Sequence, residues 1–205
     1  MKRRSIYVFL ATTLAILVPS PGRFVYGIVL VLELNLLMLV GTASVSLIKK
    51  IKLEKMMTVC VLLFLLSTTI LFRQIFIIFQ PEIILTLGFI VYLIPISLFM
   101  VGYIFNDTES KITERLRRNM IHSLTYSVFA LMYFLFRDLV GFGTFTFFGK
   151  NHQIFEKVII DSNKLGVLSI LASIPGSLIL SSILLYVYIF VRNKIDIYHK
   201  AEVSL

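Results

Sequence analysis

The chain has 205 residues, of which 58% are hydrophobic and 15% are charged. Soluble domains carry about a quarter charged residues and under half apolar ones. The composition therefore excludes an ordinary soluble globular protein, a disordered chain and a disulfide-stapled secreted module. It predicts an all-α fold: a polytopic membrane bundle that forms one transmembrane domain over residues 1–205. The single cysteine, Cys60, cannot form an intramolecular disulfide.

Six apolar segments follow one another along the chain. A membrane span needs about 20 apolar residues, and the last five segments meet that length. The predicted spans are residues 5–19, 24–48, 56–79, 83–105, 120–148 and 167–191. The first segment is short and follows three basic residues, so it is either a retained span or a cleaved secretory signal that leaves five spans. The prolines at 19 and 21 make a poor cleavage site and favour the retained span.

Basic residues are distributed unevenly between the two sides of the predicted bundle. Fourteen of the 20 Lys and Arg residues lie at the N-terminus, in loops 49–55 and 106–119 and in the C-terminal tail, against four on the other side. The positive-inside rule therefore predicts that both termini are cytoplasmic, in a cell membrane of the bacterial inner-membrane type. Because membrane orientation accounts for the net charge of +9, we expect the lipid bilayer and not nucleic acid as the partner of the basic residues.

Charged residues inside the predicted spans are the strongest functional signal. They are Glu33, Arg73, Arg137 and Asp138. Each costs about 2.5–3.5 kcal/mol on insertion scales, so a charge inside a span suggests a functional site. The rise of a helix places Glu33 about 14 Å and Arg73 about 9 Å below the outer surface. We therefore predict one polar cluster in the outer half of the bundle, with Glu33 paired to one arginine and Asp138 to the other.

Helical spacing supports a shared inward face for this cluster. Arg73 lies four residues after Thr69, and Arg137 lies four residues after Tyr133, so each pair shares a helix face. The candidate substrate-binding residues are Glu33, Asn35, Arg73, Gln74, Tyr133, Arg137 and Asp138. Two simpler interpretations compete with a binding site: arginines that extend to the headgroups, and an ion pair that only fixes helix packing.

Glycine and proline predict where the spans deviate from straight helices. Gly141 and Gly143 indicate that the fifth helix ends early, in which case residues 141–149 form a bent or interfacial segment. Pro95 should kink the fourth span and Pro175 the sixth.

The sequence contains no motif of a nucleotide-binding loop, a zinc protease, a serine hydrolase or a paired-cysteine site. We therefore expect no cofactor and no metal, and we favour a protein without enzyme activity. The leading hypothesis is a membrane subunit that binds or helps to translocate a small solute or ion at the polar cluster, driven by an ion gradient or by another membrane or cytoplasmic subunit. The second hypothesis is a sensory or scaffolding subunit that docks such a partner, and the third is an intramembrane lipid-modifying enzyme.

Overall fold

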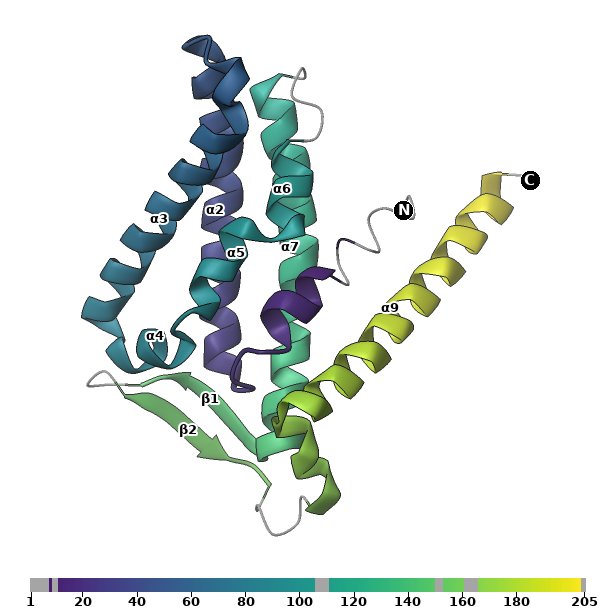
Figure 1. Cartoon of the computed structure of the whole chain (residues 1–205). Helices are drawn as coiled ribbons and strands as arrows, with labels where there is room; N and C mark the ends of the chain where they lie inside the picture. Colours follow the sequence, from purple (N-terminus) through teal and green to yellow (C-terminus); the bar gives the residue numbers. More distant parts are fainter. Residues whose placement is uncertain (1–7, 9–10, 106–110, 150–152, 161–165, 204–205) are drawn as a thin grey trace.

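A computed structural model describes residues 8, 11–105, 111–149, 153–160 and 166–203 of the chain. Its centre is a bundle of three long helices: α2 (Phe24–Lys50), α3 (Met57–Phe79) and α7 (Ile112–Phe136). Helix α2 packs against both of the others: it runs beside α7, whereas α3 lies close to α2 near the Lys50 end and diverges from it toward the β-strands (Figure 1). The expected spans 24–48 and 56–79 match α2 and α3 closely, because a long uninterrupted apolar run is enough to specify them.

Close packing of α2 depends on two glycines. A Cβ atom at Gly27 would overlap the ring of Phe134 on α7, and one at Gly41 would overlap the Ile104 side chain. Small residues of this kind let membrane helices approach closely. The apolar core beside them is completely buried at Val25, Val29 and Leu37.

The fourth predicted span is interrupted. It consists of α4 (Pro81–Leu87), a 3-10 turn (Ile90–Tyr92), α5 (Leu93–Ile96) and α6 (Leu98–Ile104). The chain bends by 67° between α4 and the part that follows it, where Gly88 adopts a φ of 50° that favours glycine. A second break follows Pro95, because Ser97 is extended and begins α6. The expected kink at Pro95 is therefore present, but residues 83–105 are not one continuous helix.

The fifth predicted span, residues 120–148, begins too late and extends too far, whereas the early end that Gly141 and Gly143 indicated is confirmed. Helix α7 begins at Ile112, passes into a π-helical turn (Arg137–Phe142), and is followed by a hairpin of β1 (Thr144–Phe148) and β2 (Ile154–Val158). The strands are antiparallel, with Thr144 opposite Val158 and Phe148 opposite Ile154. Alternating Thr and Phe residues in β1 have the two-residue period of a strand. The all-α prediction is thus corrected by a two-stranded hairpin at this end of the bundle, which we call the hairpin end.

The two terminal segments lie beside the bundle. Residues 11–17 are helical and end in a π-helical turn (Thr13–Leu17) whose Ile16 and Leu17 are buried. Because residues 1–7, 9 and 10 lie outside the described part, the structure does not decide the expected span 5–19.

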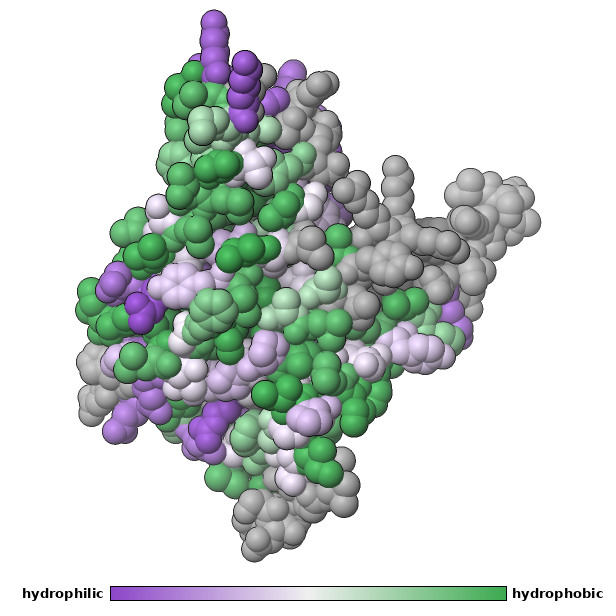
Figure 2. Space-filling view, viewed as in Figure 1, coloured by the Kyte–Doolittle hydropathy of each residue, from purple (hydrophilic) through white to green (hydrophobic). Residues whose placement is uncertain are grey.

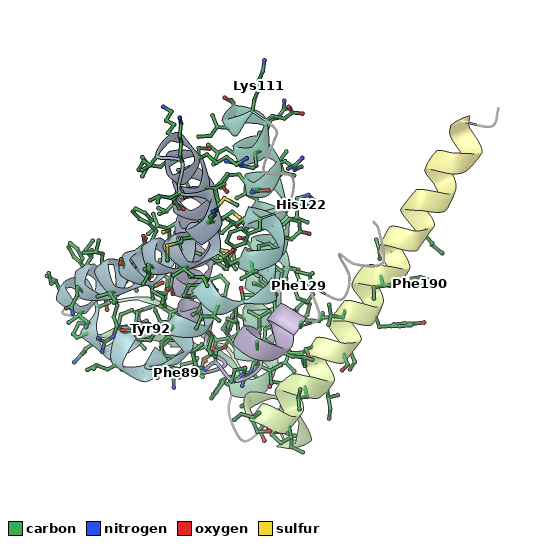
Figure 3. All side chains as sticks on the ribbon, turned by 45° about the horizontal axis from the view of Figure 1, so that its top comes forward. Phe89, Tyr92, Lys111, His122, Phe129 and Phe190 are labelled. Atoms are coloured by element: carbon green, nitrogen blue, oxygen red, sulfur yellow. The ribbon has the colours of Figure 1, made fainter. Side chains whose placement is uncertain are left out.

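The last predicted span, residues 167–191, is also corrected. It starts with a 3-10 helix (Gly166–Ala172), and the α-helix α9 (Ile174–Val203) begins only after this 3-10 helix. Pro175 therefore lies in the first turn of α9, where proline is tolerated, and does not kink the helix. Helix α9 leans away from the bundle, and Phe190 marks the part that stands apart (Figures 1 and 3).

Within the described residues, four helices are long and apolar enough to cross a membrane: α2, α3, α7 with its π-helical continuation, and residues 174–191 of α9. The count is five if the bent α4–α6 segment is one span, so six spans are not confirmed. Large apolar side chains cover the outside of the bundle, as the green surface in Figure 2 shows. They include Leu63, Leu71, Ile78, Leu85 and Phe89. Such a surface fits lipid and not water, and the helical structure with several apolar helices is consistent with a multi-pass membrane protein.

Candidate functional site

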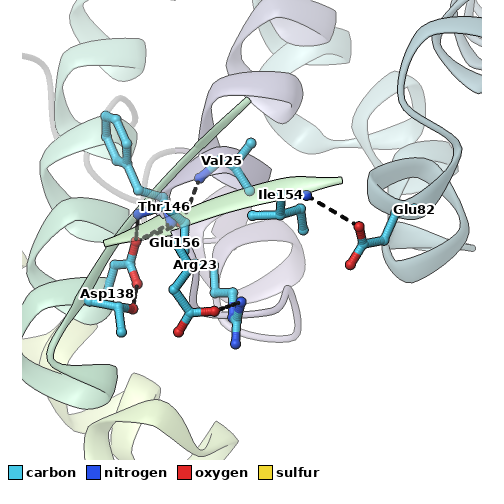
Figure 4. Close-up of polar contacts among 9 residues, drawn as sticks. Arg23, Val25, Glu82, Asp138, Thr146, Ile154 and Glu156 are labelled. Carbon is cyan, nitrogen blue, oxygen red and sulfur yellow. Dashed lines mark hydrogen bonds and ion pairs between the residues drawn. The ribbon is translucent and has the colours of Figure 1, made fainter. Parts of the chain in front are cut away.

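Asp138 joins the N-terminus of α2 to the hairpin. Its Oδ2 atom accepts hydrogen bonds from the backbone N–H groups of Phe24 (3.0 Å) and Thr146 (2.8 Å) and from the Thr146 hydroxyl (2.7 Å), while Oδ1 accepts one from the Thr144 hydroxyl (2.7 Å). The side chain is completely buried. A carboxylate with four donors at the start of a helix is well stabilised without a cation. The Thr146 hydroxyl extends this network to the N–H of Val25 (Figure 4).

Arg137, the preceding residue, binds backbone carbonyl groups and not a carboxylate. Its Nη1 atom donates to the carbonyl oxygens of Ser20 (2.7 Å) and Leu17 (3.3 Å), and its Nη2 atom donates to that of Ala172 (3.0 Å). The side chain is 2% exposed. Arg137 therefore ties the first described segment and the 3-10 helix before α9 to the end of α7, and its expected pairing with an acidic residue is wrong.

Tyr133 belongs to the same structural junction. Its hydroxyl donates to the carbonyl oxygen of Ser177 on α9 (3.2 Å), and it also interacts with the side chain of Arg137. The ring is completely buried. Tyr133 and Arg137 thus share a helix face as their spacing predicted, and this face holds α9 and the first segment against α7.

An ion pair outside the predicted cluster also fastens the hairpin. Arg23, just before α2, binds Glu156 on β2 with 2.7 Å between Nη1 and Oε2 (Figure 4). Both side chains are about one-third exposed. The hairpin is therefore fastened to α2 on two sides, by this surface pair and by the buried Asp138.

Glu33 differs from the other intramembrane charges because both of its carboxyl oxygens are buried without a hydrogen-bond partner. It lies in α2, and its side chain is 0% exposed. The Thr69 hydroxyl of α3 acts on this carboxyl group, but the two do not form a hydrogen bond of good geometry. A buried carboxyl group without donors is costly, so its presence requires an explanation that packing does not give.

Arg73 lies one helical turn beyond Thr69 on α3, toward the hairpin end. It is partly buried, and its Nε atom has no hydrogen-bond partner. Within the described part of the chain it forms no ion pair with Glu33. Gln74, the next residue, is exposed on the outside of α3. The predicted four-charge cluster is therefore divided into a structural junction at Arg137 and Asp138 and a separate pair of positions, Glu33 and Arg73.

Asn35 belongs to a polar ladder between α2 and α7. Its Oδ1 atom accepts a hydrogen bond from the Ser123 hydroxyl, and its Nδ2 atom donates to Ser127, both at 2.8 Å. The ladder continues where Asn119 donates to Thr42 (3.1 Å) and Arg115 donates to Ser46 (2.6 Å). Apart from Asn35, the residues of this ladder were not predicted from the sequence. The spacing of Arg115, Asn119, Ser123 and Ser127, one every four residues, could have revealed it.

Of the predicted residues, Glu33 is the one whose carboxyl oxygens are both buried without a hydrogen-bond partner in the described part of the chain. No three His, Cys, Asp or Glu side chains come together as a metal site in the described ranges. The sequence matches no protein-family model and no curated protein. What the arrangement can do chemically therefore follows from Glu33 and its neighbours alone: a buried carboxyl group can take up and release a proton or another small cation.

Proposed function

We propose that this chain is a non-enzymatic membrane subunit that binds a small cation at Glu33 and helps to move it across the membrane. The observation that carries the proposal is the complete burial of Glu33 with neither carboxyl oxygen hydrogen-bonded. An ionised carboxylate in this position is unfavourable, and a bound cation or proton removes that cost. Ionisable residues inside spans mark ion pathways and proton relays for this reason.

The interrupted span supports the proposal because its second break lies near Glu33. Ile104 of α6 lies against Gly41 of α2, and the two helices run in the same direction (Figure 1). Counting seven residues back on both helices places the break at Ser97 at the level of Leu34, next to Glu33. Helix α5, just before the break, packs against both α2 and α3. Broken helices at membrane depth are typical of ion and substrate sites in transporters.

The proposed orientation follows from the basic loops. With the basic residues of segments 49–55 and 106–119 on the cytoplasmic side, the hairpin end faces outside, and Glu33 lies in the outer half of α2. Arg73 then lies between the cation site and the outer surface. Under this proposal, an ion gradient or a separate subunit supplies the energy for movement.

Removing the charge of Glu33 tests the proposal. A bound cation stabilises the folded protein by mass action, by about 2.7 kcal/mol at 100 times its Kd. We expect H⁺, Na⁺ or K⁺ to raise the unfolding temperature of the protein in lipid nanodiscs at constant ionic strength. Glu33→Gln should lose this response, whereas Glu82→Gln, which changes an exposed carboxyl at the start of α4, should keep it. A response in Glu33→Gln equal to that of the wild type would contradict the proposal.

A second candidate function, a sensory or scaffolding subunit, is favoured by one observation. Arg137 and Asp138 use their hydrogen bonds to hold segments of the chain together, as expected of residues that fix a docking surface. The same experiment separates the two functions: a scaffold keeps its stability and its cation response unchanged when Glu33 is replaced by Gln.

A further inference from the structure

On α2 and α3, the groups beside Glu33 offer few ligands for a metal cation. The carboxyl group supplies two oxygens and Thr69 supplies one. Helices α2 and α3 are continuous at this depth, so their carbonyl groups are occupied in helical hydrogen bonds. The Ser97 hydroxyl at the nearby break already accepts a hydrogen bond from the N–H of Met100 (3.4 Å). Metal cations such as Ca²⁺ and Mg²⁺ need about six oxygen ligands, whereas a proton needs one.

We infer that the cation bound by Glu33 is a proton. The carboxyl group takes up this proton from the hairpin end of the bundle and releases it there, along the face of α3 that carries Thr69 and Arg73. This inference rests on the proposed function and names its ion. The titratable groups in this half of the neighbouring elements are Arg73 on α3, Tyr92 on the interrupted span, and Tyr126 and Tyr133 on α7. The ring of Tyr126 lies against Phe99, and the Tyr133 hydroxyl donates to the carbonyl oxygen of Ser177. None of these four groups is a carboxylic acid.

A lipophilic carbodiimide detects a neutral carboxyl group in a membrane. The carboxyl proton moves to one nitrogen of dicyclohexylcarbodiimide while the carboxyl oxygen bonds to the central carbon. The acyl group then shifts from that oxygen to the other nitrogen and gives a stable N-acylurea, so the protein gains one whole reagent molecule and nothing leaves. The reaction therefore needs a carboxyl group that is neutral and that becomes accessible from the lipid.

The experiment labels the full-length protein in native membranes and maps the modified residue by mass spectrometry. We expect label on Glu33 that increases as the pH is lowered, and none at this position in Glu33→Gln. A water-soluble carbodiimide should label the exposed Glu82 and not Glu33, because only the lipophilic reagent reaches the bundle interior. Na⁺ and K⁺, added at constant ionic strength, should leave the labelling rate of Glu33 unchanged.

Two results would overturn the inference, and they have different consequences for the proposed function. Slower labelling in Na⁺ or K⁺, by about tenfold at ten times the Kd, would show that a metal cation competes for the carboxyl group and that only the choice of a proton is wrong. An unlabelled Glu33 at every pH, with Glu82 labelled in the same sample, would show that the carboxyl group does not exchange protons. In that case, whether a cation raises the unfolding temperature decides separately whether the proposed function is correct.

Discussion

Replacing Asp138 by alanine should detach the β1–β2 hairpin from α2 and lower the free energy of unfolding by at least about 3 kcal/mol. The change removes the acceptor of four hydrogen bonds and leaves the N–H groups of Phe24 and Thr146 buried without a partner. Hydrogen bonds to a charged group contribute about 1.5–3 kcal/mol each, and a buried donor without an acceptor adds a desolvation cost. Thermal unfolding followed by circular dichroism in detergent measures the effect.

Two further variants make this prediction specific. Asp138→Asn should have an intermediate effect on stability. The amide nitrogen of the asparagine can donate to the Thr144 hydroxyl, which rotates to accept. The amide oxygen keeps the three hydrogen bonds that Oδ2 of Asp138 accepts. Glu156→Gln, on the same hairpin, should cost less than about 1 kcal/mol, because it breaks a partly exposed ion pair. Equal stability of the alanine variant and the Glu156→Gln variant would contradict the assigned role of Asp138.

Replacing Arg137 by methionine should release the first described segment from the bundle. The guanidinium group holds the carbonyl oxygens of Leu17, Ser20 and Ala172 together, and methionine supplies no donor for them. Arg137→Lys should also weaken the contact, because an ammonium group lacks the two-armed geometry that reaches both segments. The expected effect is local opening near Ser20, which is 1% exposed.

Reactivity of an introduced cysteine measures this opening. In a Cys60→Ser background, Ser20→Cys should react slowly with a maleimide, and Arg137→Met should accelerate the reaction at least about tenfold, which corresponds to a loss of about 1.4 kcal/mol. Lys157→Met removes an exposed positive charge on β2 and serves as the control, with no change in rate expected. A slow reaction in both Arg137 variants would show that another contact holds the segment.

The sequence predicts the long spans well and the polar contacts poorly, for a physical reason. Helices α2 and α3 follow from apolar length alone. The four intramembrane charges are identified by their cost, but their partners are not, because Arg137 binds backbone carbonyls and Asp138 binds backbone N–H groups. Backbone groups are present at every residue, so only the fold shows which of them are free.

The hairpin end shows a second limit of the sequence pattern. Residues 144–148 are apolar enough to extend a span, and only the alternation of Thr and Phe indicates a strand. The alternation matters because it turns Thr144 and Thr146 toward Asp138. The strand is therefore specified by Asp138, a polar partner six to eight residues earlier, and not by hydrophobicity. For this reason, span length alone misplaced the end of α7.

Infrared difference spectroscopy of the carboxyl stretching bands observes the proposed cation-binding group of Glu33 itself. The measurement compares the wild type with Glu33→Gln in nanodiscs at a series of pH values. A buried carboxyl group that takes up a proton predicts a neutral-carboxyl band in the wild type that changes with pH and is missing in Glu33→Gln. Spectra of the two proteins that coincide at every pH would contradict the assignment of Glu33 as the cation-binding group.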